Sequence, residues 1–468
     1  MTGVLSRSFL EADACLHYLI ARFAIDEPYR FVDVWGRPIC TAYYALPAYY
    51  FGQTGTRIAS LLLALVVGWL AMKIAKKQGH GLAGLALVFT LGQPLVFAHS
   101  FSELTELPFA ALFAGAFVAY QARQFALMAI LVSLTPLSRP EGFGVVLIAA
   151  VALLLHRKWA YLPLVMVGLV GWTHAGWELF GRQGTWWRWL PDHWPYATES
   201  TYAAGHPLHF IAAMPAVVSP LLFPPVVVGI IRGLSIVRPI GALYRKFTTD
   251  HVFRCELLIV LIPLGVTFIH GLLYWRGKMA SNGELRYLLT VAPFWGVLAG
   301  VGMVWLCNFF RLRKVFTIAF VLCAYPVLVN QFYYKVFPLG EPDDWKMCRA
   351  IASYLKEQPA DAPQRDRLMA SHPGVYFFLD TSPSSGDTAV DMTRANIANP
   401  PPNTRLIFDD MYASHNADRE RVIREADIVN AGWVLDESLQ RVIDKTLPPS
   451  TDSLAQKGAR WRAYVSPE

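Results

Sequence analysis

Two carboxylic acids, Glu11 and Asp13, stand two residues apart in a polar N-terminal stretch that also contains His17. Neighbouring carboxylates can supply a general base and a partner that orients an acceptor or holds a metal ion. Side chains two residues apart diverge by about 200° on a helix, so we expect this pair to converge only in extended backbone before a helix at 14–24. The simpler structural interpretation is that Asp13 caps that helix and Glu11 is solvated.

Two further groups of charged residues lie in short loops between apolar segments. Glu103 and Glu106 are three residues apart, so one helical turn would present both on one face. Their simpler role is to compensate the dipole of a helix N-terminus. Arg139 and Glu141 flank Pro140 at a predicted helix break, where they form either a local ion pair at a turn or part of a reaction site.

A basic group, Arg276, Lys278 and Arg286, follows a later apolar segment. Arginine binds phosphate through two parallel hydrogen bonds and lysine acts as a point charge, so a phosphate is one expected partner. Pairing with Glu284 and other acids is the alternative. When a hydroxyl attacks a sugar carbon that carries a phosphate, a carboxylate can remove the hydroxyl proton as a base and cations can stabilise the departing phosphate. The loops together offer both kinds of group.

Composition predicts an α-helical polytopic membrane protein with a C-terminal α/β domain outside the membrane. The 468 residues are 54% hydrophobic and only 16% charged, against about 25% charged in soluble domains. We assign 1–332 to the membrane domain, with 1–50 as an external catalytic loop, and 333–468 to the extramembrane domain. A pI near 9.0 does not indicate nucleic-acid binding, because the excess Lys and Arg lie in short loops that set topology.

Ten membrane-spanning segments are expected from the apolar runs, at 55–73, 81–98, 109–122, 125–137, 143–155, 159–178, 210–231, 257–275, 288–307 and 316–332. Alternate loops are basic and acidic. The positive-inside rule makes the basic loops cytoplasmic, so both termini and every acid-bearing loop face outside. Export of 1–50 would need a preceding segment, and we expect an N-terminal helix encoded upstream of this start.

The C-terminal part has an α/β pattern. A helix is expected at 345–357 and an exposed helix at 418–427. Strands are expected at 367–371, 375–379, 405–408 and 429–435. Without a nucleotide-binding glycine motif or a catalytic triad spacing, this domain is interpreted as an accessory or lid-like domain.

Three motifs resemble those of the polytopic GT-C glycosyltransferases, which use polyprenyl- or dolichyl-phosphate sugars. Glu11-Ala12-Asp13, with His17 and Arg22, is similar to their first external loop. The run 138–142 (Ser-Arg-Pro-Glu-Gly) is similar to a frequent feature of bacterial members. The run 283–287 (Gly-Glu-Leu-Arg-Tyr), with Pro293, resembles a degenerate His-Lys-Glu-x-Arg-Phe…Pro pattern of mannosyltransferases, with Asn282-Gly283 in place of His-Lys.

The resemblance covers about 9–332 and implies a bacterial inner-membrane enzyme that transfers a sugar, with mannose as the suggested sugar, by inversion on the exoplasmic face. The donor is a polyprenyl-phosphate sugar, and the acceptor is a glycan, lipid or protein. Asp13 would be the base and Glu11 its partner. A divalent metal, Mg²⁺ or Mn²⁺, is allowed but not required, with Glu11, Asp13 and Glu103 as candidate ligands.

The remaining site residues are assigned from the same expected reaction. Arg276, Lys278 and Arg286 would hold the donor phosphate. A second group would shape the acceptor site: Glu103, Glu106, Arg139, Glu141 and His17. The rival functions are a secondary transporter, which would place ionisable groups near mid-membrane, and a non-catalytic scaffold of sugar-polymer assembly, which would tolerate Asp13→Asn.

Overall fold

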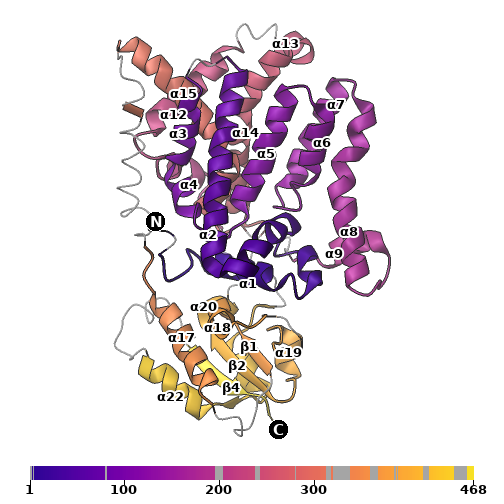
Figure 1. Cartoon of the computed structure of the whole chain (residues 1–468), viewed down its shortest axis with the longest axis vertical. Coiled ribbons are helices and arrows are strands. Elements are labelled where there is room, and N and C mark those ends of the chain that lie inside the picture. Colours follow the sequence, from indigo (N-terminus) through magenta and orange to yellow (C-terminus); the bar gives the residue numbers. More distant parts are fainter. Residues whose placement is uncertain are drawn as a thin grey trace.

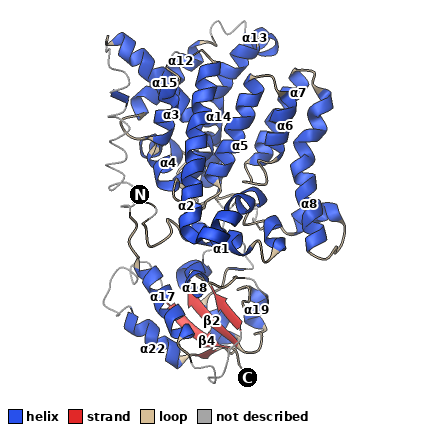
Figure 2. Ribbon diagram, viewed as in Figure 1, coloured by secondary structure: helices blue, strands red, loops and turns tan. Residues whose placement is uncertain are grey.

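The computed structural model is a bundle of helices joined to a smaller α/β domain (Figures 1 and 2). The structure describes residues 3, 5–79, 82–195, 204–237, 243–279, 281–311, 318–319, 338–358, 367–383, 386, 388–414, 421–446 and 461–467. The C-terminal domain lies at one end of the bundle, and helix α1 (Ala12–Phe23) lies between the two parts.

The principal bundle helices are mostly apolar. They are α2 (Pro38–Lys77), α3 (Gly84–Leu91), α4 (Pro94–His99), α5 (Glu106–Gln121), α6 (Phe125–Ser133), α7 (Gly142–Leu155), α8 (Val167–Leu179), α12 (Phe223–Ser235), α14 (His251–Arg276) and α15 (Ala292–Phe309). Shorter elements join them: η1 (Pro28–Val32), η2 (Trp159–Met166), η3 (Trp186–Arg188), α9 (Trp189–Asp192), α10 (His209–Ala212), α11 (Met214–Val218), α13 (Leu243–Thr249) and η5 (Leu285–Val291).

Among the described helices, three stretches combine the length and the apolar composition needed to cross a bilayer: Pro38–Lys77, His251–Arg276 and Leu285–Phe309. Shorter apolar helices, α7 and α12, stand beside them. Many large apolar side chains on the bundle are exposed, as expected for a surface that faces lipid. The predicted fold class, a polytopic helical membrane protein with a C-terminal α/β domain, is confirmed.

Several predicted spans differ from the helices in detail. The span at 55–73 belongs to a longer helix, α2, in which Gly52 has non-helical backbone (φ +57°). The spans at 81–98 and 210–231 are each interrupted, because Pro94 begins the new helix α4 and Pro224 stands in the first turn of α12. The span at 159–178 is divided between η2 and α8. The span at 316–332 lies mostly outside the described residues.

The C-terminal domain contains a four-stranded sheet in the order β1-β2-β4-β3. Strand β1 (Arg367–Ala370) is parallel to β2 (Thr404–Asp409), and β4 (Trp461–Val465) runs antiparallel to both β2 and β3 (Val434–Leu435). The helices described beside the sheet are α17 (Asp343–Lys356), α18 (Pro373–Leu379), α19 (Arg394–Ala398), α20 (Asp410–Ser414), α21 (Glu425–Asn430) and α22 (Glu437–Thr446). The boundary predicted between 332 and 333 falls outside the described residues.

The sequence pattern misassigned part of this domain. The strand predicted at 375–379 is helix α18, because Pro373 occupies its first turn and the imidazole Nδ1 of His372 accepts a hydrogen bond from the Gly374 amide. The strand predicted at 429–435 is reduced to β3 after α21. Strand β4 was not predicted. Much of the helix predicted at 418–427 lies outside the described residues.

Aromatic packing joins the C-terminal domain to the N-terminal segment. The ring of Phe9 lies 5.4 Å from that of Trp345 and 5.1 Å from that of Phe377, which also packs on Tyr18. Polar contacts extend the interface, since the Ser382 hydroxyl donates to Glu27 at 3.0 Å. Helix α1 is therefore covered on one side by the C-terminal domain.

Helices α12 and α15 approach each other closely because glycines face each other across the contact. A Cβ added at Gly302 would lie 1.8 Å from the Pro225 carbonyl oxygen, and one added at Gly229 would lie 2.0 Å from that of Leu298. We predict that Gly302→Ala forces the helices apart and lowers the apparent melting temperature, with a cost of about 1–3 kcal/mol.

The matched control is Gly171→Ala on α8, where the added Cβ meets nothing within 4 Å. Alanine is the better helix former, so this variant should melt at or slightly above the parent temperature. Thermal unfolding in detergent measures both variants, and equal melting temperatures would show that the α12–α15 contact is loose.

Candidate active site

Arg286, which lies in η5, brings together acids that are far apart in the sequence. Its Nη1 lies 2.7 Å from Oε2 of Glu11, and its Nη2 lies 2.6 Å from Oδ2 of Asp13. Its Nε contacts the carboxylate of Glu284 and lies 3.7 Å from Oε1 of Glu106. We call these five residues the Arg286 cluster. Only 11% of the arginine side chain is exposed, whereas the side chains of Glu11 and Asp13 are 33% and 40% exposed, so the guanidinium is buried while these two acids reach solvent.

Local backbone geometry explains why Glu11 and Asp13 converge. Glu11 is the residue before α1 and has extended backbone, with φ −147° and ψ 157°. Asp13 lies in the first turn, so α1 begins at Ala12 and Asp13 is not its cap. The change from extended to helical backbone directs both carboxylates toward the same guanidinium. The two carboxylates thus converge although only Glu11 is extended, because the helix begins at Ala12 and not at 14 as predicted.

A second arginine extends the cluster through Glu106. Arg139 Nη1 lies 2.5 Å from Oε1 of Glu106, and its Nη2 lies 2.9 Å from Oε1 of Glu141. Its guanidinium also lies over the ring of Tyr287, 5.5 Å from the centroid. Arg139 and Glu141 therefore form the local ion pair that the sequence allowed, and Glu106 connects this pair to the Arg286 cluster.

His99, His270 and Tyr287 border these charges, and of the three only Tyr287 belongs to a motif singled out from the sequence, the run 283–287. His270 on α14 places its Nε2 3.5 Å from Oε1 of Glu141 and stacks on Tyr287. The Tyr287 hydroxyl donates to Oδ1 of Asn282 at 2.6 Å. His99 and Glu11 line the same small cavity. A histidine inside an otherwise apolar segment, as at position 270, is a signal that could have identified one of them.

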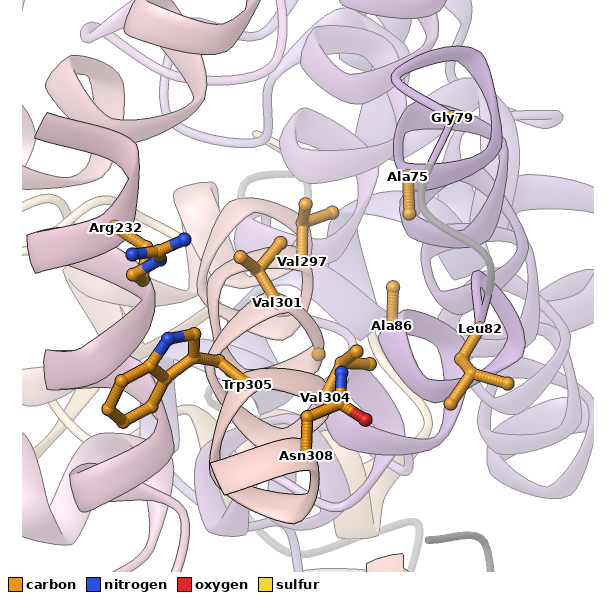
Figure 3. Close-up of a pocket in the computed structure, with 11 residues that line it drawn as sticks. Ala75, Gly79, Leu82, Ala86, Arg232, Val297, Val301, Val304, Trp305 and Asn308 are labelled. Carbon is orange, nitrogen blue, oxygen red and sulfur yellow. The ribbon is translucent and has the colours of Figure 1, made fainter. Parts of the chain in front are cut away.

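A cavity of about 180 Å³ opens at the Arg286 cluster. Its lining comes from the N-terminal segment, from α4 and from the start of η5 with the residue before it, and includes Leu10, Glu11, Leu95, His99, Glu284 and Arg286. A cavity of about 270 Å³ lies elsewhere in the bundle, between α3, α12 and α15 (Figure 3). Arg232 and Trp305 lie at one side of it, and no acid of the Arg286 cluster lines it. The smaller cavity is therefore the candidate active site.

The groups at the site differ in protonation. Burial raises the pKa of Asp13, but the charge of Arg286 and a hydrogen bond from it outweigh burial, so the net shift is downward. Burial, together with repulsion from Glu11 and Asp13, raises the pKa of Glu284 to about 6 despite Arg286. Burial lowers the pKa of His17 to about 4. At neutral pH Asp13 is therefore ionised and His17 is neutral.

Glu103 does not join the Arg286 cluster. Helix α5 begins at Glu106, so Glu103 precedes it and the two acids do not share a helical turn, contrary to the prediction. The Thr56 hydroxyl donates to Oε1 of Glu103 at 2.6 Å. Burial raises the pKa of Glu103 to about 7, although this hydrogen bond and Arg57 act in the opposite direction. Glu103 thus lies in a separate polar contact between α2 and the loop before α5.

The predicted basic group consists of Arg276, Lys278 and Arg286, and no contact among the described residues joins these three side chains. Arg276 is exposed and packs over the ring of Trp275, 4.7 Å from its centroid. Lys278 is half-buried. Of the three cations, Arg286 is the one whose described ion pairs reach the acids. His17 lies one turn after Asp13 on α1, is buried, and stacks on Trp35 at 6.5 Å between ring centroids.

The proposed metal ligands, Glu11, Asp13 and Glu103, are not brought together, because Glu103 pairs with Thr56. Within the described part of the chain, no three His, Cys, Asp or Glu side chains are grouped so that they could hold a metal ion. Glu11 and Asp13 are both occupied by the guanidinium of Arg286. In this arrangement, a cation at the two acids would have to compete with Arg286.

The fold is GT-C-like. No family model matches the chain, and no curated protein sequence matches it. Among solved structures, ArnT from Cupriavidus metallidurans in the apo state, a GT-C glycosyltransferase, superposes with a TM-score of 0.60 at 12% identity, covering 100% of this chain and 97% of that one. The same protein bound to undecaprenyl phosphate gives a TM-score of 0.55 at 13% identity, covering 86% and 89%. The sequence resemblance to GT-C enzymes is thus confirmed at the level of the fold.

We predict that Arg286→Lys destabilises the protein, because a single ammonium cannot bridge Glu11 and Asp13 as the planar guanidinium does. Each charged hydrogen bond lost should cost roughly 1.5–3 kcal/mol. The control is Arg276→Lys, which removes an exposed guanidinium from the same part of the chain. A melting temperature lowered equally by both substitutions would argue against the Arg286 cluster as the determinant.

The raised pKa of Glu103 predicts a pH-dependent stability. Between pH 4.5 and 7 the folded state holds a proton that the unfolded state has released, so the free energy of unfolding falls as pH rises through this window. Glu103→Gln should remove this loss, about 1–3 kcal/mol, and raise the melting temperature at pH 8 but not at pH 5. Glu437→Gln, which changes an exposed acid, should leave the profile unchanged. A Glu103→Gln variant less stable than the parent at pH 8 would contradict the prediction.

Proposed function

We propose that this protein is a membrane glycosyltransferase that transfers a sugar from a polyprenyl-phosphate donor to an acceptor hydroxyl. The observation that carries the proposal is the Arg286 cluster, which gathers four carboxylates and a guanidinium beside a cavity in a GT-C-like fold. A solved structure of this fold, that of ArnT, holds undecaprenyl phosphate, which supports a lipid phosphate as the donor carrier.

The reaction proposed is an inverting substitution. The acceptor oxygen forms a bond to the anomeric carbon from the face opposite the phosphate, and the acceptor proton passes to a carboxylate. The bond between that carbon and the phosphate oxygen breaks, and its electron pair remains on the phosphate. Asp13 is the proposed base because it is ionised at neutral pH and lies beside the cavity-lining residues Glu11 and Arg286.

Arg286 is the proposed phosphate ligand, with Arg276 and Lys278 as supporting cations. Because its guanidinium is already paired, phosphate binding would require one carboxylate to withdraw. Glu284 is suited to this, since its raised pKa of about 6 makes it readily protonated. Release of Glu284 would expose one edge of Arg286 to the phosphate while Glu11 and Asp13 stay held.

The cavity indicates which part of the donor enters. About 180 Å³ is below the 300–1,000 Å³ usual for small-molecule sites, so it would accommodate a phosphate or one sugar ring and leave the lipid chain outside. Glu106, Arg139, Glu141 and His17 would shape the acceptor side. We retain mannose as the proposed sugar, and the exoplasmic face of a bacterial inner membrane as the proposed location.

The position of the acids argues against a secondary transporter. Such a protein would hold its ionisable groups near the middle of the bundle. Here the cluster lies where α1 and the loop before η5 meet the N-terminus of α5, at the end of the bundle that carries the C-terminal domain. An enzyme that meets a lipid-linked donor and an extramembrane acceptor needs its charges at this end.

Transfer of labelled sugar from polyprenyl-phosphate donors by the purified protein tests the proposal. Asp13→Asn should reduce transfer by about 10²–10⁴-fold, the usual contribution of a general base. The matched control is Glu11→Gln, which removes an ion pair to the same arginine but leaves the base in place. It should retain more transfer than Asp13→Asn.

Three outcomes would change the assignment. Transfer that survives Asp13→Asn but is lost in Glu284→Gln would make Glu284 the base. Full activity in both variants would remove the cluster from the chemistry. A folded parent that transfers no sugar from any donor would favour the transporter or the scaffold.

A further inference from the structure

A second charged cavity lies at the opposite end of the bundle from the Arg286 cluster. It has a volume of about 700 Å³ and is lined by residues that follow α5, begin α6 and follow α7. Its principal lining residues are Arg123, Phe125, Leu127, His156, Lys158 and Tyr161. We call it the basic cavity. Helix α5 runs from Glu106, which belongs to the Arg286 cluster, to Gln121 near Arg123, so the helix separates the two sites.

Arg123 and Lys158, the two cations that line the basic cavity, make no ion pair with a described acid. Arg123 and Lys158 are exposed, and no acid in the described part of the chain lies within ion-pair distance of either. The Lys158 ammonium lies 5.9 Å from the ring centroid of Phe125, a second residue that lines the cavity. Two acids lie near Arg254 in the sequence: Asp250 precedes α14 and Glu256 lies on it. Among the described contacts, neither forms an ion pair with Arg254.

The inner wall supports these cations. Nε2 of His156 lies 3.3 Å from Nη2 of Arg254 and 3.3 Å from the hydroxyl of Tyr120. Burial, followed by the charge of Arg254, lowers the pKa of His156 to about 4, so the imidazole is neutral and can accept the arginine N–H. Arg254 therefore adds positive charge behind the wall of a cavity that already carries two cations.

The surroundings of the basic cavity are apolar and exposed. Leu127 is 46% exposed, Leu155 39% and Trp159 61%. These side chains belong to the same segments as the cavity lining, and exposed apolar side chains on a membrane bundle face the lipid. A ligand with an anionic head and apolar chains matches two exposed cations that are bordered by apolar side chains.

We propose that the basic cavity binds the phosphate group of an anionic ligand, and that this ligand is a phospholipid of the surrounding membrane. The phosphate would lie between Arg123 and Lys158, and the acyl chains would follow the apolar surface beside Leu127. The cavity of Figure 3 presents a single arginine, Arg232, among mostly apolar side chains, and so lacks the paired cations. This inference does not depend on the proposed glycosyl transfer.

Lipid binding by the full-length, delipidated protein tests the proposal. Native mass spectrometry would follow titration with phosphatidylglycerol, with phosphatidylcholine and with inorganic phosphate. The parent should bind phosphatidylglycerol more tightly than phosphatidylcholine. In the double variant Arg123→Gln and Lys158→Gln, phosphatidylglycerol binding should weaken roughly 30-fold. This factor assumes that the two cations contribute equally, each by the binding free energy usual for a Lys or Arg near a membrane surface.

The sequence offers a matched control for a single substitution. Arg157 is adjacent to Lys158 and exposed but does not line the cavity. Lys158→Gln should weaken phosphatidylglycerol binding more than Arg157→Gln, although both remove one charge. A thermal melt shows whether each variant is folded. If the double variant does not fold, the comparison of the two single variants still decides the question.

The outcomes separate the sources of phosphate. Binding of inorganic phosphate that is lost in the double variant, without preference among lipids, supports the phosphate site and assigns it to a soluble anion. Equal phosphatidylglycerol binding by the parent, the double variant and Arg157→Gln overturns the proposal.

Discussion

The fork of Arg286 is the interaction on which the site depends. One guanidinium contacts carboxylates from the N-terminal segment, from the start of α5 and from its own loop, with 11% of its side chain exposed. Four carboxylates in so small a volume would repel each other strongly without a cation between them. Arg139 shares Glu106 with Arg286, so a second positive charge stabilises the same group of acids. Charge balance therefore holds α1 against the bundle.

Apolar packing holds α1 from the other side. Phe9 and Tyr18 pack against Trp345 and Phe377 of the C-terminal domain, and the contact is buried. Asp13 and Tyr18 lie on α1 and Phe9 lies just before it, so the C-terminal domain packs against the segment that carries these acids without supplying a member of the Arg286 cluster. This gives the domain, interpreted from sequence as accessory, a physical role in orienting the site.

Charge is distributed unequally between the two ends of the bundle, and the sequence alone predicts this. Acids precede the helices at one end and basic residues follow them at the other, as α5 shows with Glu106 at its start and Arg123 just past its end. Apolar length, loop charge and the three weak motifs were sufficient for the fold class, because lipid-facing helices must satisfy every backbone polar group within a short, apolar segment. Proline positions decided where predicted spans break, as at Pro94.

The sequence by itself determined the class of fold and the two charged ends, since these depend on composition and on the lengths of the apolar segments. Only the tertiary structure decided that Arg286 and Glu106 join that pair while Glu103 turns to Thr56, and that His270 reaches Glu141. Strand β4 and helix α18 were equally beyond the sequence pattern. The reason is that these contacts form between side chains that are far apart in the sequence and become neighbours only in the folded, buried interior. Spacing along the chain does not show which distant side chains will meet there.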